Sequence, residues 1–419
     1  MLTEFSKHSK IAPQFGNRNK PFTVLDGKGL EITTKEYGIL FDAVAGYWYN
    51  ILGMRNPELV KVKHETGGVT THLYEEYTNP YAEDLAASMC NRTSMEQLVF
   101  SATGSMANEN ARKEAVKYHL AQGEKEENLV FITINGSYHG SVGEMLKLID
   151  PERNEYTIDA PIYEKKYQSN EIVNDFKEKI EKAKINDKVV AGFFYEPIMG
   201  VRGSVPLPSE YVNGIGKICR KNNILMIADE VTTGVGRAGK FAYSQSFDEK
   251  PDIICMGKAI SGGHYPVAIT LFNKKIIDAW NRLEDEGFSF SQIHRRGNSI
   301  TGTQEGCSLG LKVLEILDRD NLIEQVQQKG KYAVEKLKKL EGFSNVREIR
   351  GTGLLIGIDV LNSTFAKETI TPEMRKYGIN ILPEGRVIMF NPAYIVSEAQ
   401  IDYFVNTLSK VLQNNNKKI

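Results

Sequence analysis

Cysteine is scarce in this sequence of 419 residues. The four cysteines, Cys90, Cys219, Cys255 and Cys307, are scattered, and no two of them form a C-x-x-C pair. Disulfide frameworks and zinc sites need dense or regularly spaced cysteines, so this pattern argues against both. It fits a reducing compartment, and we expect a cytoplasmic protein.

An excess of charge and long apolar runs are also missing. The 52 Lys+Arg and 53 Asp+Glu residues leave a formal net charge of −1, whereas a nucleic-acid-binding protein more often shows a basic excess. Apolar runs such as Val189–Tyr195 are far shorter than the roughly 18 residues that cross a bilayer, and the N-terminus has no apolar signal region. The seven histidines show no ligand spacing. We therefore expect no nucleic-acid partner, no membrane and no metal.

The middle of the chain alternates short apolar segments with amphipathic ones. Strands are expected at Gln97–Ala102, Leu129–Ile134, Val189–Glu196, Ile224–Asp229, Asp252–Met256 and Val267–Phe272. Helices are expected at Ser105–Gln122, Ile172–Lys184, Ser209–Asn222 and Lys275–Leu283. Continuous apolar strands that alternate with helices indicate a mostly parallel sheet covered by helices on both faces.

The two ends of the chain have a different pattern. Short hairpins with turn residues such as Asp26–Gly29 precede residue 60. After residue 310 come helices, strands within 346–360, a helix opened by Thr371-Pro372, and a last helix whose capping box is Ser397 with Gln400. We predict an α/β fold with a large domain at 61–310. A smaller α+β domain is formed from both ends, 1–60 and 311–419.

The stretch from 224 to 267 carries the strongest chemical signal. Asp229 ends one predicted strand, and Lys258 directly follows another. In an open parallel sheet, ligands bind outside the carboxyl ends of the strands, so both side chains can face one crevice. A desolvated lysine is a nucleophile towards an aldehyde, and a carboxylate keeps a pyridine nitrogen protonated. Pyridoxal 5'-phosphate (PLP) needs this pair, although a simple ion pair at the strand ends is the alternative.

Two further segments suggest cofactor contacts. Thr103-Gly104-Ser105 lies between a strand and a long helix, where free N–H groups can bind a phosphate; plain N-capping is the alternative. Tyr138-His139-Gly140 follows another strand, and an aromatic ring there can stack on a planar cofactor. An aromatic side chain at the rim of the site is the alternative for Tyr138.

These segments, taken together and in order, resemble the class III (ω-aminotransferase) family of PLP-dependent enzymes of fold type I. The matching blocks are ADEVTTGVGRAGKFA, PDIICMGKAISGG, YHGS, EPIMG and RGTGLLIG, and the resemblance covers nearly the whole chain. It implies that Lys258 forms the Schiff base and moves the substrate proton, and that Asp229 pairs with the pyridine nitrogen. The large domain would be the PLP-binding domain.

The resemblance also implies the remaining cofactor contacts. Val231 packs under the ring and Tyr138 stacks on its other face, while Glu196 supports the site from a neighbouring strand. Gly104, Ser105 and the Met106 N–H hold the phosphate. The family brings a threonine from the partner subunit to the phosphate, and the aligned residue here is Ser299. A homodimer with shared active sites follows from this resemblance.

The chain departs from the family at two positions that usually grip a substrate carboxylate. Arginines are replaced there by Ser141 and by Leu382, and neither can imitate a bidentate guanidinium. Another arginine takes that role, or one substrate lacks the carboxylate. The candidates are Arg386 first, then Arg202, Arg295 and Arg296, each of which is alternatively a solvated surface charge. Tyr47, Trp48 and Tyr49 lie where relatives line the substrate pocket, with core packing as the alternative.

We therefore expect an aminotransferase that takes an amino group from an amine or amino-acid donor and gives it to a ketone, aldehyde or keto acid. A PLP-dependent racemase, epimerase or aminomutase would share the first half of the reaction and differ in where the proton returns. A non-catalytic protein on the same fold is a third possibility, but the Lys258 and Asp229 pair argues against it.

Overall fold

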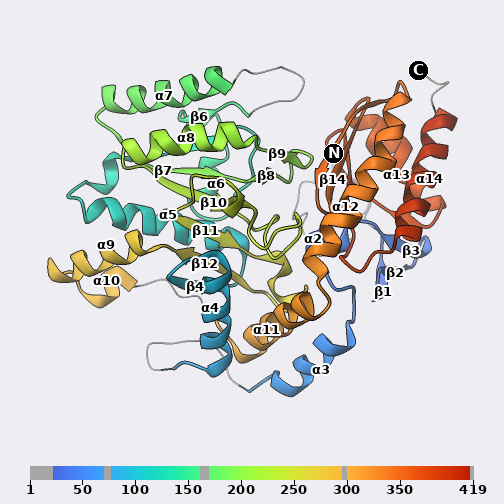
Figure 1. The fold of residues 1–419 in the computed structure, drawn as a ribbon, viewed down its shortest axis with the longest axis horizontal. Coiled ribbons are helices and arrows are strands. Elements are labelled where there is room, and N and C mark those ends of the chain that lie inside the picture. Colours follow the sequence, from blue (N-terminus) through green and yellow to red (C-terminus); the bar gives the residue numbers. More distant parts are fainter. Residues whose placement is uncertain (1–21, 70–76, 161–168, 295–299, 416–419) are drawn as a thin grey trace, which may run out of the picture.

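The computed structural model describes residues 22–69, 77–160, 169–294 and 300–415. They form two lobes (Figure 1). The large lobe is built around a seven-stranded sheet, and the small lobe contains both ends of the described chain. The short segment α2 (Ala45–Trp48) lies between them. No helix of the described residues is long and apolar enough to cross a membrane.

The sheet of the large lobe is parallel except for one strand. Its order is β4 (Gln97–Ser101), β12 (Ala268–Phe272), β11 (Ile253–Met256), β10 (Leu225–Asp229), β7 (Val189–Tyr195), β5 (Leu129–Ile134) and β6 (Thr157–Ile158). Strand β12 runs antiparallel to both neighbours, β4 and β11. The predicted mostly parallel sheet is confirmed. The apolar run at Val267–Phe272 predicted a strand but carried no information on its direction.

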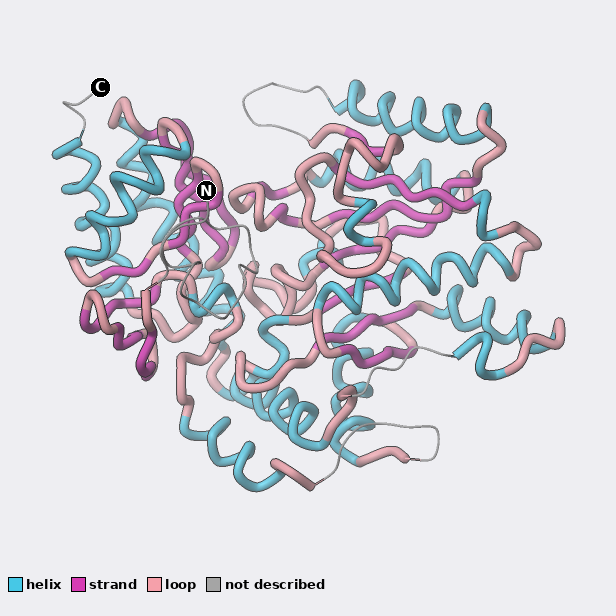
Figure 2. The backbone as a smooth tube through the Cα atoms, turned by 180° about the vertical axis from the view of Figure 1, so that it is seen from behind, coloured by secondary structure: helices cyan, strands magenta, loops and turns pink. Residues whose placement is uncertain are grey.

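Helices cover both faces of this sheet, as Figure 2 shows from behind. Alternate residues of β10 belong to different cores: Leu225 and Ile227 pack with α5 (Gly104–Leu120) and α9 (Lys274–Asp285), while Met226 and Ala228 pack in the core that also includes α7 (Ser169–Ile185) and α8 (Ser209–Lys221). Because successive strand residues point to opposite faces, a strand buried on both faces is apolar throughout. This explains the continuous apolar runs in the sequence.

The small lobe joins segments from the two ends of the chain. One sheet has the order β1 (Val24–Lys28), β2 (Glu31–Thr34), β3 (Gly38–Asp42) and β15 (Ile379–Asn380). A second has the order β13 (Val346–Thr352), β14 (Leu355–Val360), β17 (Val387–Phe390) and β16 (Leu382–Glu384). Helices α12 (Leu322–Lys338), α13 (Thr371–Lys376) and α14 (Glu398–Asn415) accompany them. The parallel pairing of β15 with β3 unites the ends, so the predicted α+β unit is confirmed.

Two helices lie across the domain boundaries that the sequence suggested. Residue 60 falls within α3 (Pro57–Thr66) and residue 310 within α11 (Gln304–Arg319), and these helices pack against each other. Helix α4 (Pro80–Thr93) packs on α11 as well. The chain therefore passes from one lobe to the other through continuous helices.

Two predicted helix starts can be compared with the structure. The capping box of α14 is confirmed: the Gln400 N–H donates to Ser397 Oγ at 3.2 Å, and the Ser397 N–H donates to Gln400 Oε1 at 3.0 Å. The predicted helix at Thr371-Pro372 is confirmed, since α13 begins at Thr371 with proline in its first turn, but Thr371 is not its cap, because a π-helical turn, η5 (Phe365–Ile370), precedes it. The Thr371 hydroxyl donates to the Ala366 carbonyl, so the side chain itself continues the helical hydrogen bonding into α13.

The remaining elements are short. They are η1 (Glu126–Asn128), α6 (Met145–Leu148), β8 (Ile198–Met199), β9 (Val205–Pro206), η2 (Tyr243–Ser246), η3 (Lys258–Ser261), α10 (Phe290–His294) and η4 (Lys339–Gly342).

Candidate active site

The chemical residues predicted from the sequence lie at one edge of the large sheet. Strands β10 and β11 are parallel neighbours, with Asp229 opposite Cys255, and Lys258 begins η3 just after β11. Strand β7 ends immediately before Glu196. Because parallel strands present their carboxyl ends at the same edge, three ionisable side chains from three strands are gathered there. The predicted crevice for Asp229 and Lys258 is present.

Lys258 is held in a strained and enclosed position. Its φ of 41° lies in the left-handed region, which is uncommon for a residue other than glycine and occurs often at functional sites. Its Nζ donates to Thr232 Oγ1 at 2.8 Å and lies 5.1 Å from the centre of the Trp48 ring. Burial lowers the pKa of the Lys258 amine from its usual value, and the charges of Asp229 and Glu196 partly restore it. This environment favours a neutral, nucleophilic amine.

Asp229 is buried, with both carboxylate oxygens accepting hydrogen bonds. Its Oδ2 accepts from Asn108 Nδ2 at 2.7 Å and lies 2.9 Å from His139 Nδ1, while its Oδ1 accepts from the Val231 N–H at 3.0 Å. Hydrogen bonds to the ionised form stabilise it. The arrangement is suited to keeping a negative charge at the base of the site.

Glu196 lies beside this pair on the end of β7. Its two oxygens accept from the Tyr138 N–H at 2.9 Å and from the Gly200 N–H at 3.0 Å. Burial raises the pKa of Glu196 to about 7, and the negative charge of Asp229 adds to the increase. Glu196 therefore fixes the backbone at Tyr138, and its own charge changes near neutral pH.

The N-terminus of α5 faces the same site. Thr103 caps the helix, since its Oγ1 accepts from the Met106 N–H at 3.3 Å, so the capping alternative considered for this segment is present. A Cβ added to Gly104 would lie 2.5 Å from Val231 Cγ1, and one added to Gly140 would lie 2.5 Å from Ser105 Oγ. These glycines permit a close approach of backbone segments that larger residues would prevent.

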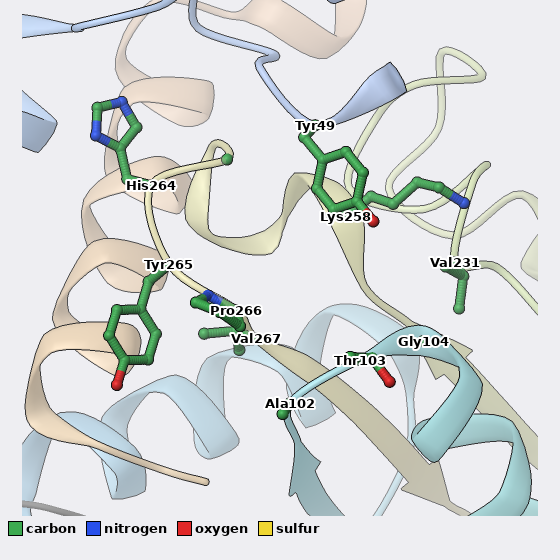
Figure 3. A pocket seen from close by; sticks show the side chains of 11 residues that line it. Tyr49, Ala102, Thr103, Gly104, Val231, Lys258, His264, Tyr265, Pro266 and Val267 are labelled. Carbon is green, nitrogen blue, oxygen red and sulfur yellow. The ribbon is translucent and has the colours of Figure 1, made fainter. Parts of the chain in front are cut away.

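A cavity of about 360 Å³ opens between these elements (Figure 3). Its lining comes from four segments and is formed by Tyr49, Ala102, Thr103, Gly104, Val231, Lys258, Gly263, His264, Tyr265, Pro266 and Val267. In Figure 3 the Lys258 side chain extends from beside Tyr49 towards Val231. Cofactor pockets typically occupy about 300–1,000 Å³, so the volume is suited to a small molecule.

The predicted substrate residues Tyr47 and Trp48 lie in an unusual backbone turn. Four consecutive residues, 45 to 48, have φ between 48° and 75°, which is a left-handed helical turn. The Asp42 side chain holds it by accepting from the Gly46 N–H at 2.6 Å and the Val44 N–H at 3.3 Å. Each non-glycine residue in this conformation costs about 1–2 kcal/mol. The turn places the buried Trp48 ring over Lys258, while Tyr47 is 44% exposed.

The positions that replace the family's arginines have different surroundings. Leu382 packs in a small apolar cluster with Trp48, and Ser141 is exposed. Arg386 forms a two-point ion pair with Asp359, with Nε to Oδ1 at 2.7 Å and Nη2 to Oδ2 at 3.1 Å. The Arg202 guanidinium donates to the Asn135 carbonyl. The predicted residues Arg295, Arg296 and Ser299 lie outside the described residues.

Sequence reasoning missed three contacts of the central pair. Asn108 and His139 bind Asp229, and Thr232 binds the Lys258 amine. Asn108 is one turn into α5, on a helix face otherwise lined by small alanines such as Ala107 and Ala111. A polar residue on such a buried face could have signalled a hydrogen-bonding role.

The comparisons with known proteins agree with this geometry. The profile of the family "Aminotransferase class-III" matches residues 14–412. The chain belongs to the class III aminotransferases. It is 28% identical to the adenosylmethionine-8-amino-7-oxononanoate aminotransferase of Methanocaldococcus jannaschii, over 89% of this chain and 88% of that protein. It is also 28% identical to the acetylornithine aminotransferase of Clostridium acetobutylicum, over 94% and 96%.

Solved structures give the same result. An amine transaminase from an uncultivated Pseudomonas species in its PLP-bound form superposes with a TM-score of 0.87 at 25% identity, covering 97% of this chain and 98% of that one. The ω-transaminase of Pseudomonas jessenii in complex with PMP has the same fold, with a TM-score of 0.88 at 22% identity and 100% and 99% coverage. The predicted fold type I architecture, PLP dependence and aminotransferase class are confirmed for this class III aminotransferase.

The residues present also fit PLP on their own chemistry. A partly buried lysine amine that lines the cavity can meet the aldehyde, a buried carboxylate can face a pyridine nitrogen, and the N-terminus of a 17-residue helix can receive a phosphate. The Gly104 position, which has no room for a Cβ beside Val231, keeps that end of the cavity open.

Proposed function

We propose that Lys258 and Asp229 carry the aminotransferase reaction of this chain, at the carboxyl edge of β10 and β11. The supporting observation is a partly buried amine just after β11 and a buried, fully hydrogen-bonded carboxylate at the end of the neighbouring parallel strand β10. When bound, PLP supplies an aldehyde for the lysine and a protonated ring that accepts the electrons released at the substrate carbon. The donor is an amine or amino acid, and the acceptor is an aldehyde, ketone or keto acid.

Lys258 binds the cofactor and moves the proton. Burial lowers the pKa of its amine and so favours the neutral form, which can accept a proton at Nζ. Thr232 orients this nitrogen through its hydroxyl, 2.8 Å away. The Trp48 ring covers the amine and excludes water from that side.

The Asp229 carboxylate would bind the ring nitrogen of the cofactor and stabilise its proton. The hydrogen bonds from Asn108 and the Val231 N–H, with His139 at 2.9 Å, keep the carboxylate oriented. Val231 and Tyr138 would hold the cofactor ring between them. Gly104, Ser105 and the Met106 N–H, which here donates to Thr103 Oγ1, would hold the phosphate, and Glu196 positions Tyr138 through its backbone N–H.

We also propose a cytoplasmic homodimer in which Ser299 of the partner subunit completes the phosphate site. The four cysteines support a reducing compartment, since all are buried free thiols. The dimer rests on the resemblance to class III enzymes.

The direct test is to locate the cofactor and then remove its anchor. Borohydride reduction of the holoenzyme followed by peptide mass mapping should place PLP on Lys258. Lys258→Ala should lose this attachment, and turnover should fall by roughly 10²–10⁴-fold or more. Lys274→Ala is the matched control, because that lysine is exposed on α9 in an ion pair with Asp278. A Lys258→Ala protein with full turnover would refute the assignment.

The same protein can be tested for the racemase, epimerase or aminomutase alternative. A transaminase converts the donor to a carbonyl product and leaves the cofactor aminated. The alternative enzymes instead exchange the substrate Cα proton for solvent deuterium without a carbonyl product. No turnover of any amine in the presence of bound PLP would favour the non-catalytic alternative.

A further inference from the structure

The substrate end of the site carries a leucine where the family usually carries an arginine, and a glutamate lies two residues further on. Strand β16 spans Leu382–Glu384, and its first and third side chains lie on the same face because strand side chains alternate. Leu382, in place of the arginine, packs with Trp48. Glu384, two residues on, accepts a hydrogen bond from the Tyr47 hydroxyl at 2.5 Å. The face of β16 that meets α2 is therefore apolar at one end and negatively charged at the other.

A continuous series of contacts joins this carboxylate to the reactive lysine. The Lys258 amine lies 5.1 Å from the Trp48 ring, and the Trp48 and Tyr47 rings meet edge to face at 4.9 Å. The Tyr47 hydroxyl then reaches Glu384. Glu384 is only partly exposed and has no basic partner among its contacts in the described part of the chain.

The described arginines that could have bound a substrate carboxylate are engaged elsewhere. Arg386 is paired with Asp359, and Arg202 donates to a backbone carbonyl. A substrate carboxylate placed against Glu384 would meet a like charge. A positive charge placed there would meet a carboxylate and aromatic faces, which is the combination that binds ammonium groups.

We propose that Glu384, oriented by Tyr47, binds the second ammonium group of a diamine donor whose first amine reacts at Lys258. This inference rests on the proposed function. Burial and the neighbouring Glu384 raise the pKa of Tyr47, so its hydroxyl remains a hydrogen-bond donor to the carboxylate. The left-handed turn at 45–48 fixes Tyr47 and Trp48 at the cost of backbone strain, and such strain is concentrated at functional sites.

The test compares donors of equal length that differ only in their distal group. Putrescine is compared with butylamine and with γ-aminobutyrate, and cadaverine with pentylamine. At one or both lengths the diamine should have a kcat/KM roughly tenfold above that of its monoamine, which corresponds to one charge-assisted contact. The amino acid should be the poorest donor of its set. Equal values for diamine and monoamine at both lengths would overturn the proposal.

The variant Glu384→Gln keeps the size of the side chain and removes its charge. It should lower kcat/KM for the preferred diamine by roughly tenfold and leave its monoamine within about twofold. Asp402→Asn is the matched control, because Asp402 also accepts from a tyrosine hydroxyl, that of Tyr332, on the outer helices of the small lobe. A loss of equal size for both donors would indicate a structural role and would contradict our inference.

A binding measurement separates this proposal from the proposed function. Butyltrimethylammonium and pentyltrimethylammonium carry the distal charge but no reactive amine, so calorimetric titration of the holoenzyme needs no turnover. Binding that is present in the wild type and weakened by Glu384→Gln supports the cation site even if no amine is transaminated. Failure of the aminotransferase assignment would instead appear as the absence of PLP on Lys258. No binding of either cation to the wild type would overturn the cation site.

Discussion

The two ends of the active site are built in different ways. At the cofactor end, Asp229, Glu196 and Lys258 extend from three consecutive positions of one sheet, and their partners are buried hydrogen-bonding groups. At the substrate end, a strained turn before residue 50 meets a short strand after residue 380. Regular secondary structure fixes the geometry of the cofactor end, and contacts between distant parts of the chain fix that of the substrate end. The comparison teaches that the residues proposed for chemistry and those proposed for substrate binding are supported by separate parts of the fold.

The largest effect should come from the charge at the base of the cofactor end. Asp229→Asn removes the negative charge with little change of volume, and kcat should fall roughly hundredfold or more because the cofactor ring loses its counter-charge. Steady-state kinetics and PLP titration measure this. Asp278→Asn, on the exposed surface of α9, serves as control. If kcat changed less than the KM for the donor, our assignment of chemistry to one end of the site and of substrate binding to the other would be wrong.

The cofactor end should also impose a pH dependence on stability. The pKa of Glu196 is raised to about 7 from 4.5, so the folded chain retains a proton that the unfolded chain releases. Stability should therefore fall as the pH rises through this window, by up to about 3 kcal/mol.

Glu196→Gln should abolish that contribution. Thermal unfolding of the apo protein at about pH 5 and about pH 8 tests this, with the exposed Glu398→Gln as control. Wild type and Glu196→Gln showing the same change in midpoint would contradict the assignment.

A smaller effect is expected where the backbone approaches the cavity. Gly104→Ala would place a Cβ 2.5 Å from Val231 Cγ1, and the resulting displacement should weaken PLP binding roughly tenfold. The double variant with Val231→Ala should recover part of the loss. Gly342→Ala has nothing within 4 Å of the new Cβ and should be neutral. A normal PLP affinity for Gly104→Ala would show that this edge is less tightly packed than described.

The smallest effect concerns the turn at the substrate end. Gly46 has φ +57° and Gly29 has φ +59°, so alanine at either position should cost about 1 kcal/mol of stability. The new Cβ at Gly46 would lie 2.3 Å from Asn50 Nδ2, whereas Gly29 has open space. Only Gly46→Ala should therefore raise KM for the donor, by a few fold. Equal KM values in both variants would show that the turn does not contribute to substrate binding.

The cofactor end could be predicted from the sequence because strands determine its geometry. Asp229 and Lys258 both follow apolar runs, and parallel strands bring their carboxyl ends together. The antiparallel direction of β12 could not be predicted, because an apolar run reads the same whichever way the strand lies in the sheet. Neither could the contact of Asn108 with Asp229, because a helix residue meets a strand residue 121 positions away.

The substrate end was harder to predict from the sequence, because contacts between distant parts of the chain determine its geometry. Tyr47 and Trp48 were candidates, but their left-handed conformation depends on Asp42, and residues other than glycine rarely adopt it. Arg386 was the first carboxylate candidate, and its pairing with Asp359 appears only when β14 and β17 lie side by side. The role proposed for Glu384 could not be predicted, because a glutamate in a short polar segment is usually a solvated surface residue.

The hydrogen bond between Asn380 Nδ2 and Asp42 Oδ1, 3.3 Å long, joins residues that are 338 positions apart. At the usual rate of synthesis, about 5–20 residues per second, the ribosome needs roughly 20–70 s to add the second after the first. During that interval β3 has been synthesised but its neighbour β15 has not, so the edge of β3 is open to other chains. Tyr49 to Val267, which include the cavity lining and Lys258, are therefore all synthesised before β15, and a chaperone that covers the open edge of β3 would be of use in this interval.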